Sequence, residues 1–353
     1  SKLDSDGSRA TISDQFFRRE FVRSLHIASM NAMWSKLDSD IVGFFNPLAK
    51  DPAVRAPVRN GWPLQRLDYA VAIASVYLAF VIGCKVMSKP SEKKKSASTK
   101  GKVSVAEKIK QDGIVVFAAM AIYNATQVAL CGWMVYASIV EHRAKGMSLV
   151  CNRHDLAEDG MAFVNHVFYL SKVLDFADTV FMIVKGNWHQ VTFLHVYHHT
   201  SIFLVYWLNA QANYASDIYL TIVLNGTIHF IMYGYYFATA FNVTVPNIIK
   251  KSITKLQLFQ FCCMEVQGLV LLLGNCESPR NITILYMVYI STMMILFLDF
   301  FFKSYSKKPS KSATTDSAAK SAGEDSDNAS TVASESETTC CGTIEGKTRK
   351  KVQ

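Results

Sequence analysis

Three histidines at helical spacing are the clearest chemical feature of the sequence. His195, His198 and His199 stand at positions i, i+3 and i+4 of an apolar stretch. Residues at this spacing share one face of a helix, so their imidazole rings converge. A single histidine would most often be a satisfied core residue, whereas three at this spacing predict a functional site.

A second apolar stretch carries charges. Lys172, Asp175 and Asp178 follow one another at steps of three, which places them roughly along one helix face. Ionisable side chains are costly inside a bilayer, so they are candidates for a functional site. The alternative for Lys172 and Asp175 is a structural ion pair, while Asp178 has no partner within its own helix.

Two further stretches add polar side chains without a charge. An aromatic belt at the membrane interface is an alternative for Tyr236, and bridging between helices is one for the two glutamines. Neither alternative explains Asn225 or His229. The candidates are Asn225, His229, Tyr233, Tyr236, Gln257 and Gln260.

Clustered histidines permit two chemistries. The first is metal binding, since imidazole binds iron and zinc readily, and membrane di-iron desaturases and hydroxylases contain several histidine boxes. This sequence has only one such box, and His26, His142 and His154 are expected on the other side of the membrane, so a di-iron site would lack ligands. We expect no metal and no other cofactor.

The second chemistry is nucleophilic catalysis. A neutral imidazole can attack a thioester and form an acyl-imidazole. A site of low dielectric favours the neutral ring. Asp175 or Asp178 could orient the ring and fix its tautomer.

The elements that position these residues are predicted to be membrane helices. Half of the 353 residues are hydrophobic, and a bilayer requires about 20 mostly apolar residues per helix. A large soluble helical bundle is the alternative, but stretches this apolar with short connections are rare in soluble proteins. The sequence contains seven such stretches: Tyr69 to Met87, Gly113 to Val140, Met161 to Val184, Val191 to Leu208, Asp217 to Ala240, Thr254 to Gly274 and Ile282 to Phe302.

Charge and the C-terminal residues predict the topology. Lys350 and Lys351 form a dilysine retrieval signal, which requires a cytosolic C-terminus. Seven spans then place the N-terminus in the lumen, and the loops follow the positive-inside rule. The net charge of +9 points to membrane surfaces and anionic substrates, and no nucleic-acid motif is present. This topology places four groups of polar residues toward the cytosolic side of their helices: Lys172 to Thr179, His195 to His199, His229 to Tyr236, and Gln257 with Gln260.

The remaining regions are tails. Residues 1–66 are expected to form a lumenal tail without a cleavable signal peptide, in which Ala10 to Leu37 predicts an amphipathic interfacial helix. A mitochondrial transit peptide is the alternative, which Asp14 and Glu20 oppose. Residues 67–303 form the seven-helix domain, and residues 304–353 are expected to be a disordered cytosolic tail.

Two cysteines fall in predicted lumenal loops. Cys151 and Cys276 would lie in an oxidising compartment, which favours a disulfide between them. The alternative is two free thiols.

Four ordered motifs resemble one known family. The runs KVLDFADT, HVYHHT, NGTIHFIMYGYY and TKLQLFQ, in this order on seven spans, resemble the very-long-chain fatty-acid elongases, and most closely the polyunsaturated-fatty-acid elongases of algae and related protists. The resemblance covers roughly Tyr69 to Phe302. Most of the family has Glu where this chain has Asp175, so this carboxylate is shorter by one methylene.

The resemblance implies an all-α polytopic enzyme of the endoplasmic reticulum, with an acyl tunnel enclosed by seven transmembrane helices. It implies a 3-oxoacyl-CoA synthase whose partners are acyl-CoA, malonyl-CoA, membrane lipid and other fatty-acid elongation enzymes, and it allows a homodimer. His198 would carry the acyl group and face His229, with the other box histidines and both aspartates in support. The implied substrate contacts are Lys172, Asn225, Tyr233, Tyr236, Gln257 and Gln260, while Lys255 is placed at the cytosolic mouth by charge and depth. After a condensing enzyme and a metal-dependent lipid enzyme, a seven-helix receptor or transporter is the third functional class that the sequence allows.

Overall fold

The computed structural model describes residues 12–59, 61–88, 104–157, 160–213 and 217–305, and the regular structure within these ranges is helical. The elements are α1 (Ile12–Phe45), the short 3-10 helix η1 (Pro47–Ala49), α2 (Pro52–Arg59), α3 (Leu67–Met87), α4 (Val105–Asp112), α5 (Ile114–Ala144), α6 (Gly160–Val184), α7 (Phe193–Ala212), α8 (Ile218–Ala240), α9 (Asn247–Leu273) and α10 (Arg280–Tyr305).

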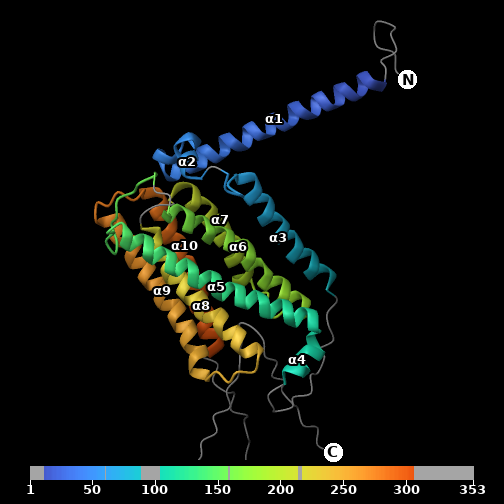
Figure 1. The fold of residues 1–353 in the computed structure, drawn as a ribbon, viewed down its shortest axis with the longest axis vertical. Coiled ribbons are helices and arrows are strands. Elements are labelled where there is room, and N and C mark those ends of the chain that lie inside the picture. Colours follow the sequence, from blue (N-terminus) through green and yellow to red (C-terminus); the bar gives the residue numbers. More distant parts are fainter. Residues whose placement is uncertain (1–11, 60, 89–103, 158–159, 214–216, 306–353) are drawn as a thin grey trace, which may run out of the picture.

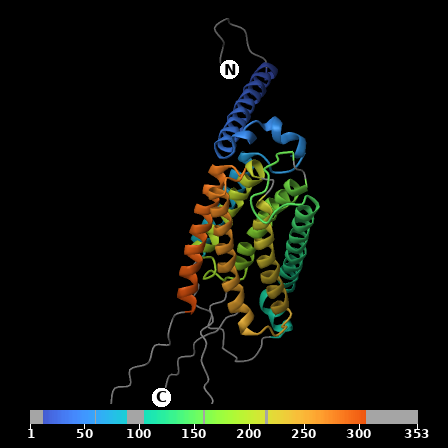
Figure 2. The same cartoon turned by 90° about the vertical axis from the view of Figure 1, so that its left-hand side faces the viewer.

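The long helices α3 and α5 to α10 form one bundle in which successive helices run in opposite directions (Figures 1 and 2). Each of them matches one of the predicted apolar stretches, and no stretch extends more than two residues beyond its helix. Helices α1 and α2 lie at one end of the bundle, and α4 lies at the other (Figure 1). Because the direction alternates, the start of α7 and the ends of α6 and α8 lie at the same end as α4.

Five of the bundle helices are long and apolar enough to cross a membrane: α3, α5, α8, α9 from Ser252, and α10 to Lys303. Helices α6 and α7 are not among these five, and many of their residues, polar ones included, are buried. Lys172, Asp175 and Thr179 of α6 are all buried. The chain is therefore an all-helical polytopic membrane protein in which polar side chains face protein instead of lipid.

Small residues allow close helix packing. Helix α3 buries Ala70, Ala74, Tyr77 and Val81 along one stripe, and its other faces are largely exposed. Helices α5 and α8 approach closely at Gly226, where an added Cβ would lie 2.8 Å from Cγ2 of Val135. Close approach at small residues is the usual mode of packing between membrane helices. Gly226 lies within the NGTIH run, so this packing fixes the position of the α8 motif.

The connections at the α1 end of the bundle are tied together. A disulfide joins Cys151, in the loop after α5, to Cys276, in the loop after α9. It links the two cysteines that the sequence places in lumenal loops. The loop after α5 is also bound to the start of α8, because the side-chain amide of Asn152 donates to Asp217 Oδ1 at 2.8 Å.

The N-terminal helix differs from the expected amphipathic segment. Helix α1 continues to Phe45 and projects away from the bundle (Figure 1). Phe21 and Met30 are 65% and 56% exposed. Nine residues are two and a half helical turns, so these two side chains lie on opposite sides of α1. The apolar residues therefore do not form one face, and the predicted one-sided amphipathic helix is corrected.

Parts of three predictions lie outside the described residues. These are the nature of the C-terminal tail from residue 306, with the dilysine signal at Lys350 and Lys351, the lysine-rich loop residues 89–103 that contribute to the positive-inside pattern, and the first eleven residues of the N-terminal tail.

Candidate active site

The histidine box occupies the first turns of α7. Thr192 caps this helix, since its hydroxyl accepts from the backbone N–H of His195 at 3.2 Å. The ring centroids of His195 and His199 lie 4.3 Å apart, and those of His198 and His199 lie 5.4 Å apart. The predicted convergence of the three rings on one helix face is present.

His195 is held by a hydrogen bond with α6, and its partner there is in turn bonded to α3. Its Nε2 lies 2.8 Å from the hydroxyl of Thr179 on α6, which in turn lies 2.9 Å from the hydroxyl of Tyr77 on α3. Tyr77 stacks on Phe176 at a centroid distance of 4.1 Å. This chain fixes the orientation of the His195 ring and leaves it less available for covalent chemistry.

His198 and His199 are less constrained. The Nδ1 atoms of both rings are buried and have no hydrogen-bond partner among the described residues. The His198 ring packs edge-on toward Phe297 of α10, with centroids 6.5 Å apart. His198 is close enough to His229 of α8 for the two rings to interact electrostatically. The pairing of these two imidazoles in catalysis stays a prediction.

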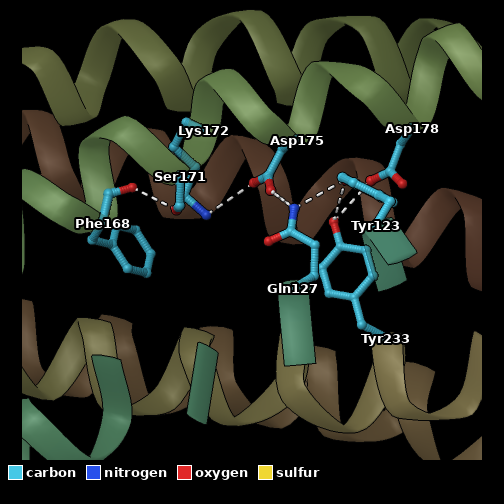
Figure 3. A network of polar contacts seen from close by, with 8 residues as sticks. All are labelled: Tyr123, Gln127, Phe168, Ser171, Lys172, Asp175, Asp178 and Tyr233. Atoms are coloured by element: carbon cyan, nitrogen blue, oxygen red, sulfur yellow. Dashed lines mark hydrogen bonds and ion pairs between the residues drawn. The ribbon is translucent and has the colours of Figure 1, made fainter. Parts of the chain in front are cut away.

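Asp175 is the centre of a buried ion pair. Its Oδ2 accepts from the ammonium of Lys172 at 3.1 Å, and its Oδ1 accepts from the amide of Gln127 on α5 at 2.8 Å (Figure 3). The Lys172 ammonium also lies 4.1 Å from the ring centroid of Phe168. The structural alternative for Lys172 and Asp175 is thus realised, and this pair also lies within electrostatic range of His229.

Asp178 finds its partner on another helix. The hydroxyl of Tyr233 on α8 donates to Asp178 Oδ2 at 2.8 Å (Figure 3). The same hydroxyl lies 3.3 Å from that of Tyr123, which accepts from the Gln127 amide at 3.0 Å. One amide on α5 therefore connects the surroundings of both carboxylates.

Neither carboxylate forms a hydrogen bond with a histidine in the described part of the chain. The role of Asp175 and Asp178 in fixing a ring tautomer stays a prediction, which no direct hydrogen bond among the described residues supports. Asp175 is satisfied by Lys172 and Gln127, and Asp178 is satisfied by Tyr233. The hydroxyl of Thr179, one residue after Asp178, makes the contact with the box instead.

The remaining predicted contacts lie at different depths of burial. Gln260 is buried, and its Oε1 has no hydrogen-bond partner among the described residues. Asn225 and Gln257 are half-buried, and Lys255 is exposed. Tyr236 is half-buried with its ring centroid 6.1 Å from that of Tyr233. Asn225 and the two glutamines can therefore offer amide groups to a bound molecule.

Helix α4 lies at the end of the bundle that holds the histidines. Its Lys108 donates to the carbonyl oxygen of Thr239, at the end of α8, at 2.7 Å. Its Asp112 pairs with Lys185, at the end of α6, at 2.9 Å. Burial lowers the pKa of Lys108, as does the neighbouring Lys185, while Asp112 raises it. Lys185 is therefore engaged in an ion pair at this end of the bundle.

Three other histidines lie elsewhere. His142 stacks on Tyr219 with centroids 4.0 Å apart, and His154 and His166 contact Asn46 and Trp62. Within the residues that the structure describes, no group of three or more His, Cys, Asp or Glu side chains has the spacing to hold a metal ion.

Sequence reasoning gave no role to several residues of this site. Gln127 is a polar residue in an otherwise apolar stretch, which is a detectable signal. Thr179 lies within the KVLDFADT run. Tyr77 and Tyr123 carry no signal of their own, because tyrosine in an apolar helix is ordinary.

Comparison with known proteins identifies the family. The model of the GNS1/SUR4 (ELO) family matches residues 62–313, which include every bundle helix. The chain belongs to the ELO family.

Its relatives include elongases from animals and protists. "Very long chain fatty acid elongase 2" of Mus musculus is 33% identical over 196 residues, which cover 54% of this chain and 67% of the mouse protein. "Very long chain fatty acid elongase 5" of Tachysurus fulvidraco is 31% identical over 193 residues, 54% of this chain and 66% of that protein. "Fatty acid elongase 6" of Leishmania major is 33% identical over 212 residues, 56% of each chain. The chain is thus an ELO-family protein of fatty-acid elongation.

Proposed function

We propose that this ELO-family protein catalyses the condensation step of fatty-acid elongation. Acyl-CoA and malonyl-CoA would give 3-oxoacyl-CoA, CoA and carbon dioxide. The observation that carries the proposal is the convergence of three imidazoles at the start of α7, with the Nδ1 atoms of His198 and His199 unpartnered among the described residues, in a family whose members include elongases. An untethered imidazole beside a second one is suited to acyl transfer.

The first step would be acyl transfer to His198. A ring nitrogen attacks the thioester carbonyl, the carbon–sulfur bond breaks, and CoA leaves as the thiolate, which takes up a proton. His198 suits this role better than His195, whose Nε2 is bonded to Thr179. Like His198, His199 has a buried Nδ1 without a hydrogen-bond partner among the described residues. Its side chain is more deeply buried than that of His198, with an exposed fraction of 7%.

The second step would be carbon–carbon bond formation. Malonyl-CoA loses carbon dioxide, and the electron pair of the broken bond forms an enolate. The enolate carbon attacks the acyl-imidazole, the carbon–nitrogen bond breaks, and His198 is restored. Stabilisation of the developing negative charge is the main task of such a site. Candidates for this task are His229, Asn225, Gln257, Gln260 and the Lys172 ammonium, with Tyr233 and Tyr236 bordering the substrate.

The substrate class and location extend the proposal. The four motifs resemble those of polyunsaturated-fatty-acid elongases, so we expect long-chain polyunsaturated acyl-CoA to be used. The family resemblance implies the endoplasmic reticulum membrane, and the basic loops favour a bundle with its histidine end toward the cytosol. Elongation assays with saturated, monounsaturated and polyunsaturated acyl-CoAs of matched length test the preference directly.

The central experiment replaces one box histidine. His198→Ala should reduce incorporation of labelled malonyl-CoA to background, while the variant remains folded and membrane-inserted. His189→Ala is the matched control, because His189 is exposed in the connection between α6 and α7 and lies outside the box. Full activity of His198→Ala would refute the assignment.

The reaction as proposed uses no metal. Chelators should leave the activity unchanged, and stoichiometric iron or zinc should not co-purify with active protein. Loss of activity on chelation, restored by one metal, would favour the alternative of histidine-box metal chemistry.

A further inference from the structure

A cavity lies at the end of the bundle opposite the histidines. It has a volume of 450 Å³ and opens between α1, α2, the start of α3 and the end of α7. These elements meet at the α1 end of the molecule (Figure 1). Among the residues that line the cavity are Trp34, Asp38, Arg55, Gln65, Arg66 and Gln211.

The inner wall of the cavity carries a buried ion pair. Arg55 is 3% exposed, and its guanidinium donates to Asp38 Oδ2 at 3.0 Å and to Gln211 Oε1 at 2.7 Å. Nε of Arg55 and Oδ1 of Asp38 are buried and have no hydrogen-bond partner among the described residues. Buried polar atoms are normally satisfied, so this pair retains one donor and one acceptor for a further group.

The rim carries a second pair. Arg66 donates from Nε and Nη2 to the Asp68 carboxylate at 2.9 and 2.7 Å, and from Nη2 to Asn31. Its side chain is 46% exposed, and no hydrogen bond among the described residues uses its Nη1. Two arginines and two aspartates line the cavity, so its formal charge is zero, which suits a zwitterion better than a simple anion or cation.

The level of the cavity is that of lipid headgroups. Leu67 begins the first membrane-spanning helix and lines the cavity together with the residues on either side of it. Trp34 is of the type that favours the membrane interface. On α1, Met30 and Met33 are neighbours in sequence of the cavity-lining residues Asn31 and Trp34, and each is 56% exposed. A polar cavity next to exposed apolar side chains at this level fits an amphiphile.

We propose that this cavity binds the headgroup of a zwitterionic phospholipid with a primary amine. Nη1 of Arg66 would bind the phosphate, since guanidinium groups are well suited to phosphate oxygens. The ammonium would lie between the Asp38 carboxylate and the Trp34 ring. A primary ammonium can donate a hydrogen bond to Asp38, which a quaternary one cannot. The acyl chains would follow the exposed apolar residues of α1 and α3.

Lipid binding to the purified full chain tests this proposal. The protein is reconstituted with equal amounts of phosphatidylethanolamine, phosphatidylcholine and phosphatidylglycerol, and retained lipid is identified by native mass spectrometry. One phosphatidylethanolamine should be retained per chain, about tenfold more often than phosphatidylcholine, as expected from one charge-assisted hydrogen bond. Arg66→Gln, on the exposed rim, should lower this retention, and Asp38→Asn should abolish the preference for the primary amine.

Matched controls lie on the same helix. Asp40→Asn and Arg23→Gln change exposed charges of α1 that do not line the cavity, so they should retain the lipid. Equal retention of the three lipids, or equal retention by Arg66→Gln and the controls, would overturn the proposal. Displacement of the lipid by soluble phosphoethanolamine at similar concentration would assign the cavity to a free metabolite instead. Asp38→Asn removes the carboxylate that pairs with Arg55, so the folding of this variant is checked by thermal unfolding. If Asp38→Asn unfolds, the result for Arg66→Gln alone tests the proposal.

Discussion

Two carboxylates three residues apart on α6 have different surroundings. Asp175 forms an ion pair with Lys172, while Asp178 accepts a hydrogen bond from a tyrosine hydroxyl of α8. Gln127 connects the two environments, but an amide does not readily pass a proton along a hydrogen-bonded chain. The network in Figure 3 therefore orients side chains and does not serve as a proton path between the carboxylates.

The Lys172–Asp175 pair makes a specific prediction for stability. Lys172→Met leaves a buried carboxylate without its cation and should cost about 3–5 kcal/mol of unfolding free energy. The double variant Lys172→Met/Asp175→Leu removes both charges and should recover much of this loss. Thermal unfolding of the purified protein in one detergent measures both. Equal stability of the single and double variants would show that the pair is not electrostatically coupled.

At the scale of elements, the loop after α5 contains a titratable contact. The side-chain nitrogen of Asn46 lies 3.1 Å from Nε2 of His154. The Asn46 oxygen accepts from the backbone N–H of Leu48, so its amide nitrogen is the donor and His154 Nε2 the acceptor. The pKa of His154 is lowered, chiefly by burial, while Glu277 and Asp155 oppose the shift.

This contact should weaken in acid. A histidine with a lowered pKa in the folded state contributes its full stability above its ordinary value of 6.5 and loses it as the pH falls below that value. Acidification from about pH 7.5 to 5.5 should therefore increase hydrogen exchange in the loop that contains His154. His154→Gln should remove this pH dependence, whereas His26→Gln, on exposed α1, should preserve it. An unchanged pH profile in His154→Gln would contradict the account.

The sequence allows prediction of elements more readily than of their contacts. Each apolar stretch became a helix, because length and hydropathy are local properties. Helices α6 and α7 were recognised by their motifs although they are not among the five helices that are apolar enough to cross a membrane by composition alone. The contacts of Tyr77 with Thr179, and of Gln127 with Asp175, depend on how α3, α5 and α6 pack. No local pattern encodes them, which is why the aspartates were expected on the histidines.

At the scale of the whole molecule, the histidine box lies at one end of the bundle and the disulfide lies at the other. The histidine box, His229 and α4 share one end, while the Cys151–Cys276 disulfide and the α1–α3 cavity share the opposite end. The alternating direction of the predicted helices already indicated that the polar groups of different helices lie toward the same side of the membrane. It gave no indication of the cavity, because its lining comes from segments far apart in the chain.

The difference between the two ends predicts the orientation of the bundle in the membrane. Leu149 and Val243 are 69% and 57% exposed in connections at opposite ends of the bundle. In a background whose free cysteines are replaced by serine, Val243→Cys should react with an impermeant maleimide in sealed microsomes. Leu149→Cys should react only after permeabilisation. The reverse pattern would place the histidines at the lumenal face and exclude cytosolic substrates.

The most direct test of the catalytic account is to locate the acyl group. Purified protein is incubated with acyl-CoA without malonyl-CoA, and its peptides are analysed by mass spectrometry. Release of CoA, together with the acyl mass on His198, and absence of both in His198→Ala, are the predicted results. Condensation by an enzyme that never carries an acyl group on His198, or that carries it on another residue, would contradict the account.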